Sequence, residues 1–240
     1  IGDEDRVKAV AKACAAKGVP IRIGVNGGSL EKHILAKYGA PTAGALVESG
    51  LYNARLLEKF DFDQIVISLK SSRVQTMIEA YRKLAACCDY PLHLGVTEAG
   101  TERMGLIKSA AGIVALLADG IGETIRVSLT ADPLREVAAA RDILKALDLC
   151  PDAPQIVSCP TCGRTRIDLI SLANEVEARL AAVKKPIRVA VMGCAVNGPG
   201  EAREADIGVA GGDGCAILFK KGEILRKILE GRIVDELMAE

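Results

Sequence analysis

The chain has 240 residues, half of them apolar, and its 31 lysines and arginines balance its 31 aspartates and glutamates, so its formal net charge is zero. This neutrality, with only 3% aromatic residues and no tryptophan, argues against binding to nucleic acid or to an anionic membrane. No apolar run approaches the roughly 20 residues that span a bilayer, and the charged start IGDEDRVKAV is not that of a signal peptide. We therefore expect a cytoplasmic protein.

The first part of the chain alternates short apolar strands with helices. Strands are predicted over residues 21–26, 65–70, 92–97 and 124–129. Ser72 is the expected start of the second helix between them, Gly120 the end of the third, and Asp132 with Pro133 the start of the fourth. Strands that are apolar on both faces and separated by helices are typical of parallel βαβ units.

Polar side chains stand at or just beyond the carboxyl end of each predicted strand. They are Asn26, Lys70, Glu98, Arg126 and Ser128. In parallel α/β folds this edge of the sheet is where substrates bind. Each residue alone has a structural alternative, such as a cap, a turn or a snorkelling cation. Because the pattern repeats on every strand, it indicates the rim of an active site.

Four βα units are too few for a closed barrel, which needs eight. Half a barrel would leave two strand edges exposed. The chain begins without Met, at acidic residues typical of the first turn of a helix. We expect either an open four-stranded sheet or, in preference, the second half of a TIM barrel whose earlier strands are missing.

The character of the sequence changes near Pro154. Strands are predicted over 155–157, 187–194 and 207–212, followed by a hairpin around Gly222, with helices over 167–183 and 233–240. These elements predict a small α+β module. We therefore divide the chain into a partial barrel domain, residues 1–152, and an α+β domain, residues 153–240, joined by the proline-bearing LCPDAP.

Eight cysteines in a long chain without an export signal are expected to be reduced thiols. Cys159 and Cys162 form the motif CPTCGR, and CxxC serves redox disulfides, zinc sites and iron–sulfur clusters alike. A redox pair leaves Cys194 unexplained, and the region offers neither a second CxxC nor a histidine to complete a structural zinc site. A 4Fe–4S cluster uses three thiolates and leaves its fourth iron to a weaker oxygen ligand, for which Glu201 is placed one short loop after Cys194.

Several motifs together resemble a known family. They are PIRIGVNGGSLEK, PLHLGVTEAG, GIGETIRVSL, CPTCGR and GCAVNGPGE. In these motifs the chain is similar to the bacterial 4-hydroxy-3-methylbut-2-enyl-diphosphate synthases, from Ile1 to about Gly212. The resemblance implies a TIM barrel followed by a small ferredoxin-like or sulfite-reductase-like domain. It also implies that Cys159, Cys162, Cys194 and Glu201 hold a 4Fe–4S cluster.

The same resemblance implies an activity. The family opens the ring of 2-C-methyl-D-erythritol 2,4-cyclodiphosphate and removes water, in the methylerythritol phosphate route of isoprenoid biosynthesis. Flavodoxin or ferredoxin supplies the two electrons, and the full-length enzyme forms a head-to-tail homodimer. The implied substrate-binding residues are Arg22, Asn26, Lys70, Arg126, Ser128 and Asn197, and the implied catalytic residues are Glu98 and Glu201. Because the family carries further phosphate-binding residues on the earlier strands, this chain alone is expected to be inactive.

Other hypotheses remain open. The first alternative is a thiol-redox protein or a structural zinc protein built on the CxxC motif. A DNA-binding iron–sulfur regulator is disfavoured by the neutral charge and the lack of a basic helix. For Glu98, the structural alternative is a salt bridge to Arg103.

Overall fold

The computed structural model of the chain describes residues 4–196 and 198–240. The chain divides into two compact units, Ile1–Leu147 and Asp148–Glu240, whereas the sequence pattern placed the division between residues 152 and 153. Within the described residues, the structure has no helix that is both long and apolar enough to cross a membrane.

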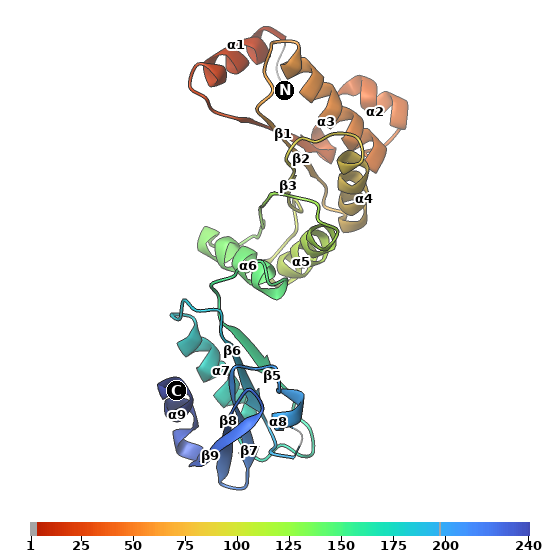
Figure 1. Ribbon diagram of the computed structural model, residues 1–240. Coiled ribbons are helices and arrows are strands. Elements are labelled where there is room, and N and C mark those ends of the chain that lie inside the picture. Colours follow the sequence, from red (N-terminus) through yellow and green to blue (C-terminus); the bar gives the residue numbers. More distant parts are fainter. Residues whose placement is uncertain (1–3, 197) are drawn as a thin grey trace. The chain divides into compact units, whose positions relative to one another are not determined.

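The first unit is built on short parallel strands (Figure 1). They are β1 (Ile21–Asn26), β2 (Ile65–Lys70), β3 (His93–Leu94) and β4 (Thr124–Ile125). β1 pairs with β2 and β3 with β4, and a parallel bridge between Ile67 and Leu92 joins the two pairs. Adjacent strands in the sequence are therefore neighbours in space, as the βαβ prediction requires.

Helices connect these strands. They are α1 (Glu4–Ala15), α2 (Lys32–Tyr38), α3 (Ala43–Glu58), α4 (Val74–Ala85), α5 (Glu102–Ala118) and α6 (Pro133–Ala146), with a short 3-10 turn, η1 (Gly27–Ser29), after β1. Asp132 caps α6 by accepting a hydrogen bond from the Leu134 N–H at 2.8 Å, and Pro133 occupies the first turn. α5 ends just before Gly120, whose φ of 74° is left-handed. These predictions of helix ends are confirmed.

Three predictions about this unit are wrong in detail. Ser72 does not cap α4, because Ser71 Oγ accepts the Arg73 N–H at 3.1 Å and the helix begins only at Val74. The strands predicted over 92–97 and 124–129 are two residues long in each case. After Leu94 the backbone leaves the ladder, and the Thr97 N–H bonds to Ser71 O in the loop after β2 at 3.3 Å.

The two faces of β1 differ in burial. Ile23 and Val25 are buried in the core that the sheet shares with the helices, and the other residues of the strand are exposed or half-buried. β2 is buried on both faces along most of its length. Since successive side chains of a strand point to opposite faces, Arg22 and Asn26 lie on the face opposite Ile23 and Val25.

The second unit is a five-stranded mixed sheet with strand order β5-β6-β7-β8-β9. The strands are β5 (Gln155–Ser158), β6 (Arg188–Met192), β7 (Ile207–Gly212), β8 (Cys215–Lys220) and β9 (Glu223–Leu229), and the helices are α7 (Leu169–Leu180), α8 (Gly198–Glu201) and α9 (Ile233–Ala239), with a 3-10 turn η2 (Glu230–Arg232). β5, β6 and β7 are parallel, and β8 and β9 are antiparallel. Lys221 and Gly222 both have positive φ, as the tight hairpin turn predicted here requires.

The central strands β6 and β7 are buried on both faces, whereas β9 is mostly exposed. Val176 and Leu237, from α7 and α9, belong to one core with Val191 and Val209. A second core gathers small side chains around Phe219. There Gly208 lies so close to the ring that an added Cβ would be 2.4 Å from Phe219 Cζ, so only glycine fits under the ring.

Candidate functional site

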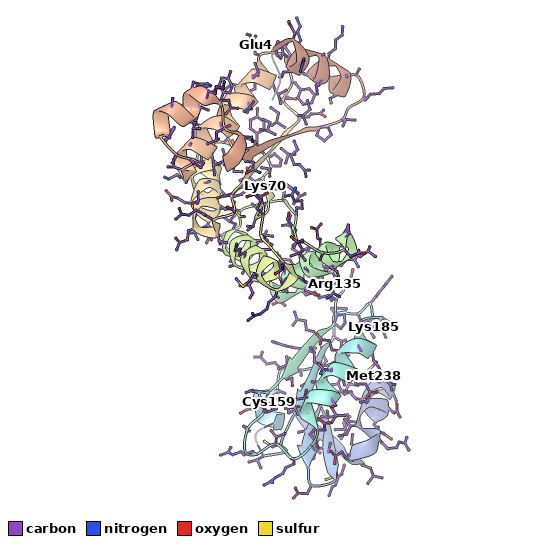
Figure 2. The ribbon with its side chains drawn as sticks, turned by 180° about the vertical axis from the view of Figure 1, so that it is seen from behind. Glu4, Lys70, Arg135, Cys159, Lys185 and Met238 are labelled. Carbon is purple, nitrogen blue, oxygen red and sulfur yellow. The ribbon has the colours of Figure 1, made fainter. Side chains whose placement is uncertain are left out.

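The polar face of the first sheet carries several of the predicted substrate-binding residues. In the parallel register of β1 and β2, Asn26 is paired with Lys70 at the carboxyl end, and Arg22 is paired with Val66. These positions share one face because they are an even number of residues apart along each strand. Lys70 is labelled in Figure 2. The side chain of Asn26 is used locally, since its Oδ1 accepts the Gly28 N–H at 3.4 Å.

His93 is a member of this face that sequence analysis missed. It lies in β3 with 6% of its surface exposed. Its Nε2 is 3.1 Å from Nη1 of Arg22, and its Nδ1 is 2.8 Å from Oγ1 of Thr124. The single polar residue in the apolar run PLHLGV was the available signal, but its partners lie 71 and 31 residues away along the chain.

The electrostatics of this face are those of an anion site. Burial, with the charges of Arg126 and Arg22, lowers the pKa of Lys70 to about 8. Burial, with Arg22, Lys70 and Arg126, lowers the pKa of His93 to about 4. Within the described residues no carboxylate forms an ion pair with any of these three cations. Lys70 is half-buried, whereas Arg22 and Arg126 are exposed. A group of like charges with no counter-charge binds an anion favourably.

The remaining residues of the predicted rim are Arg126, Ser128 and Glu98. Arg126 follows β4, and its N–H donates to Leu94 O at 2.9 Å. Ser128 is half-buried, and Glu98 is exposed. Glu98 has a left-handed backbone with φ of 51°, a conformation that costs energy for a non-glycine residue. Glu98 and Arg103, both described by the structure, form no salt bridge with each other.

In the second unit the CxxC loop and the Cys194 segment meet at one end of the sheet. Cys159 directly follows β5, and Cys194 follows β6, its parallel neighbour. The Gly193 N–H donates to Sγ of Cys159 at 3.2 Å, and the Gly193 carbonyl accepts the Arg166 N–H at 2.9 Å. One residue thus ties both ends of the CxxC loop to the end of β6 (Cys159 is labelled in Figure 2).

Cys162 lies exposed within this loop. The backbone N–H of Arg164 and the hydroxyl of Thr165 lower the pKa of its thiol. The Cys162 N–H also donates to Thr165 Oγ1 at 3.1 Å. Donors that face a sulfur stabilise its thiolate, the form that binds metal.

Glu201 ends the short helix α8, which begins just after Cys194. The Gly198 N–H donates to Cys194 O at 3.1 Å, and a Cβ on Gly198 would lie 2.9 Å from those of Met192 and Ala210. Glycine at this position therefore lets α8 lie directly on β6 and β7. Asn197, predicted to bind substrate, lies outside the described residues.

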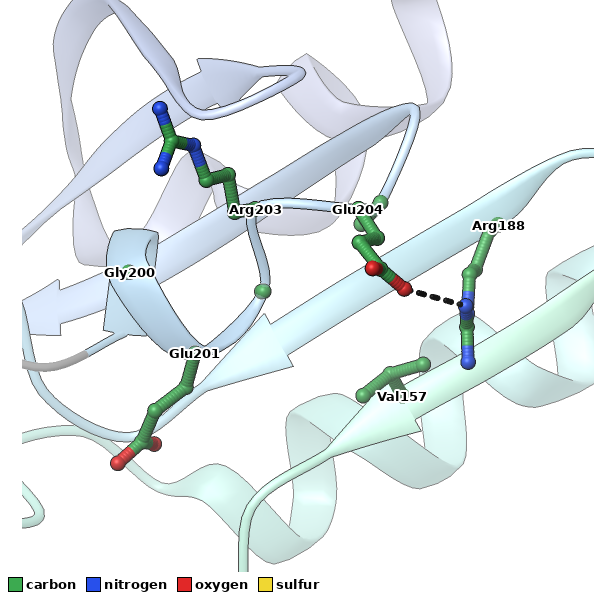
Figure 3. Close-up of a pocket in the computed structure, with 8 residues that line it drawn as sticks. Val157, Arg188, Gly200, Glu201, Arg203 and Glu204 are labelled. Atoms are coloured by element: carbon green, nitrogen blue, oxygen red, sulfur yellow. Dashed lines mark ion pairs between the residues drawn. The ribbon is translucent and has the colours of Figure 1, made fainter.

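A depression of about 310 Å³ adjoins Glu201, and it is lined by Val157, Arg188 and residues 200–205. Arg188 Nη1 and Glu204 Oε2 form an ion pair across it at 3.5 Å. Figure 3 shows the Glu201 side chain pointing away from that ion pair. The Glu201 carboxylate is therefore exposed and not held by this pair.

The four predicted metal ligands fit a thiolate cluster in their chemistry. Three thiols and one carboxylate occur in neighbouring segments, and amide N–H groups of Gly193 and Arg164 face two of the sulfurs. In residues 4–196 and 198–240, however, no group of three or more His, Cys, Asp or Glu side chains is arranged to hold a metal ion. The ligands of a multinuclear cluster lie farther apart than those of a single ion, because each thiolate binds a different iron.

Comparison with known proteins gives matches over nearly the whole chain. A family model described as the GcpE TIM-barrel domain matches residues 1–141, and one described as the GcpE protein C-terminal domain matches residues 155–240. The chain is 60% identical over 237 residues to a curated protein of Fusobacterium nucleatum and 60% identical over 238 residues to one of Clostridium perfringens. It is 59% identical over 240 residues to one of Anoxybacillus flavithermus.

All three relatives are named 4-hydroxy-3-methylbut-2-en-1-yl diphosphate synthase (flavodoxin). The matches cover 99%, 99% and 100% of this chain. They cover 67%, 68% and 66% of the respective relatives. The chain thus spans about two thirds of the length of the relatives it matches.

Proposed function

The chain belongs to the GcpE family, and from this premise we propose that it serves the reductive opening and dehydration of 2-C-methyl-D-erythritol 2,4-cyclodiphosphate to 4-hydroxy-3-methylbut-2-enyl diphosphate. The observation that carries the proposal is the group of Arg22, Lys70 and Arg126 around the neutral His93, without a carboxylate partner among the described residues. A cyclic diphosphate is a compact anion that would supply the missing counter-charge.

In this proposal residues 1–152 are the second half of a TIM barrel and bind the substrate. Residues 153–240 are a ferredoxin-like or sulfite-reductase-like domain that carries the cluster. The parallel order of β1 to β4 and the mixed sheet of the second unit are compatible with these folds. We propose a cytoplasmic enzyme that works as a head-to-tail homodimer, with flavodoxin, which the relatives' names include, or ferredoxin as electron donor.

Each predicted site residue of the first unit has a proposed role at the substrate. Arg22, Lys70 and Arg126 bind the phosphate oxygens through charge-assisted hydrogen bonds. Asn26 and Ser128 offer neutral donors and acceptors beside them, and Asn197 of the second unit adds another. Glu98 moves a proton at a substrate oxygen as the carbon–oxygen bonds break. Its exposed position and strained backbone are compatible with a functional role.

In the second unit Cys159, Cys162, Cys194 and Glu201 would hold a 4Fe–4S cluster. When bound, such a cluster supplies electrons and a Lewis-acidic iron. The chain contributes the donors that stabilise the thiolates, namely the N–H groups of Gly193 and Arg164 and the hydroxyl of Thr165. The Glu201 carboxylate is a weaker ligand than a thiolate, so a substrate oxygen can displace it. Glu201 is counted as catalytic for that reason.

Anaerobic reconstitution with iron and sulfide tests the cluster. We expect a brown protein with about four irons per chain, and a colourless protein loaded with zinc would instead support the alternative of a structural zinc or thiol-redox protein. Calorimetric titration with the cyclodiphosphate tests substrate recognition independently of the metal. Binding that is abolished in Arg126→Met and retained in Arg103→Met is the expected result. Equal affinity of the two variants would contradict the proposed anion site.

A further inference from the structure

His93 is buried in the middle of the proposed anion-binding face. It stands between the two neighbouring strands, paired with Thr124 in the β3–β4 ladder and 6% exposed. The Tyr81 hydroxyl, from α4, donates a hydrogen bond to its carbonyl oxygen. Both ring nitrogens have a partner from another segment, Arg22 from β1 and Thr124 from β4. The imidazole is thus held at both ring nitrogens, and Tyr81 holds the backbone of the same residue.

These contacts fix the position of the ring proton. A guanidinium is always protonated and can only donate hydrogen bonds. Nη1 of Arg22 is 3.1 Å from Nε2 of His93. The histidine Nε2 must therefore be unprotonated and accept the hydrogen bond with its lone pair. A neutral imidazole then carries its proton on Nδ1, which lies 2.8 Å from the Thr124 hydroxyl oxygen. The hydroxyl oxygen accepts a hydrogen bond from Nδ1–H, so the two contacts require the same tautomer.

The charged groups that act on the ring are all cationic. They are Arg22 on β1, Lys70 on β2 and Arg126 after β4. Burial and these three charges lower the pKa of His93 to about 4. The ring therefore stays neutral near pH 7 and does not add a further positive charge to the face.

We propose that His93 is a positioning residue, which holds the Arg22 guanidinium on the anion-binding face by accepting its hydrogen bond as the neutral Nδ1–H tautomer. A carboxylate in this place would also fix Arg22, but it would compete with a phosphate for the same charge. A neutral acceptor fixes the guanidinium and leaves its charge available to the ligand. This inference rests on the proposed function only in the identity of the anion.

The tautomer can be measured directly in the 240-residue chain, since it has only two histidines, His33 and His93. We expect the imidazole ¹⁵N spectrum at pH 7 to show His93 with Nδ1 protonated and Nε2 unprotonated, without titration down to pH 5. The exposed His33 is the internal reference, and His33→Gln assigns the signals. A His93 that carries its proton on Nε2, or that titrates with a midpoint between pH 6 and pH 7, would overturn the inference.

The effect on binding is tested with inorganic pyrophosphate as the probe. His93→Leu should weaken the affinity of the chain for pyrophosphate about tenfold or more, the loss expected for a hydrogen bond that positions a charged group. His93→Gln should stay within about threefold of the parent, because its side-chain carbonyl can accept from Arg22. Circular dichroism of each variant checks that it is folded.

A double-mutant cycle with Arg22→Met separates positioning from a general structural role. If His93 acts through Arg22, His93→Leu should have no further effect once Arg22 is replaced. An equal loss in both backgrounds would overturn the inference. A parent protein that does not bind pyrophosphate would overturn the anion site itself. An Nε2–H tautomer, by contrast, would refute the role of His93 and leave the proposed function standing.

Discussion

Gly193 donates its backbone N–H to Sγ of Cys159 across 3.2 Å. Its carbonyl accepts the Arg166 N–H at 2.9 Å, so Gly193 fixes the CxxC loop at both ends. Cys194 follows directly in the chain. This connection brings the two cysteine motifs, which are 34 residues apart, to one end of the sheet, as the cluster hypothesis requires.

The first prediction concerns iron content. Replacing Cys159, Cys162 or Cys194 by alanine should each lower the iron of the reconstituted chain from about four atoms to less than about one. The control is Cys87→Ala, since Cys87 is an exposed thiol of the first unit and should leave iron unchanged. Colorimetric iron analysis with absorption spectroscopy makes the measurement. Full iron in Cys194→Ala would remove Cys194 from the ligand set.

The second prediction concerns pH. Burial, Arg126 and Arg22 lower the pKa of Lys70 from 10.5 to about 8, so its ammonium is present below pH 8 and is lost as the pH rises through that value. An anion binds the charged form, and pyrophosphate affinity should therefore decrease above pH 8. Lys70→Arg should remove this decrease, because a guanidinium stays protonated.

Calorimetric titrations of both proteins between pH 7 and pH 9.5 make this comparison. The titration of pyrophosphate itself is common to the two proteins and cancels in the ratio of their affinities. A ratio that does not change with pH would contradict the assignment of the decrease to Lys70.

The third prediction concerns stability. The fully buried Tyr81 hydroxyl accepts the Leu69 N–H at 2.9 Å and donates to the His93 carbonyl. Tyr81→Phe leaves two buried backbone groups without a partner, and it should lower the free energy of unfolding by about 1–3 kcal/mol. Ser109→Ala is the matched control. In the part of the chain that the structure describes, the buried Ser109 hydroxyl has no hydrogen-bond partner, so its removal should leave stability unchanged or raise it.

Urea unfolding followed by near-ultraviolet circular dichroism is a suitable measurement. All four tyrosines belong to the unit Ile1–Leu147, and the chain has no tryptophan, so the tyrosine bands report on this unit. A destabilisation of Ser109→Ala equal to that of Tyr81→Phe would contradict the argument from hydrogen bonding.

The sequence predicted those parts of the structure that depend on local patterns. The runs IRIGVN and IVISLK formed strands over the predicted residues, and Asp132 with Pro133 began a helix. Such features depend on side-chain alternation and on capping within a few residues. The extent of β3 was not predictable in this way, because the strand ends where the backbone turns to bond with Ser71, a distant segment.

The candidate site also contains residues that the local sequence indicates and a residue that only distant contacts reveal. The cations at the strand ends could be identified from their positions, since parallel strands bring their carboxyl ends to one edge. His93 could not, because its function depends on two partners in other strands. An isolated histidine in an apolar strand gives no indication of either contact. Only the packing of β1, β3 and β4 reveals it.

The last prediction compares two glycines of the first unit. A Cβ on Gly95 would lie 2.7 Å from the carbonyl oxygen of Arg126, whereas a Cβ on Gly24 would have no atom within 4 Å. Neither glycine has a left-handed φ, so only the space around each Cβ distinguishes them. Gly95→Ala must push the Arg126 backbone away from Leu94, to which it donates a 2.9 Å hydrogen bond.

We expect Gly95→Ala to lower the free energy of unfolding by about 1–3 kcal/mol, the usual cost of overpacking, and to weaken pyrophosphate binding because Arg126 is displaced. Gly24→Ala should be neutral or stabilising by up to about 1 kcal/mol, since alanine restricts the unfolded chain. The tyrosine bands report the first quantity and calorimetry the second. If Gly95→Ala lost stability but bound pyrophosphate as the parent does, the position of Arg126 would not matter for the anion, and the proposed site would have to be redrawn without it.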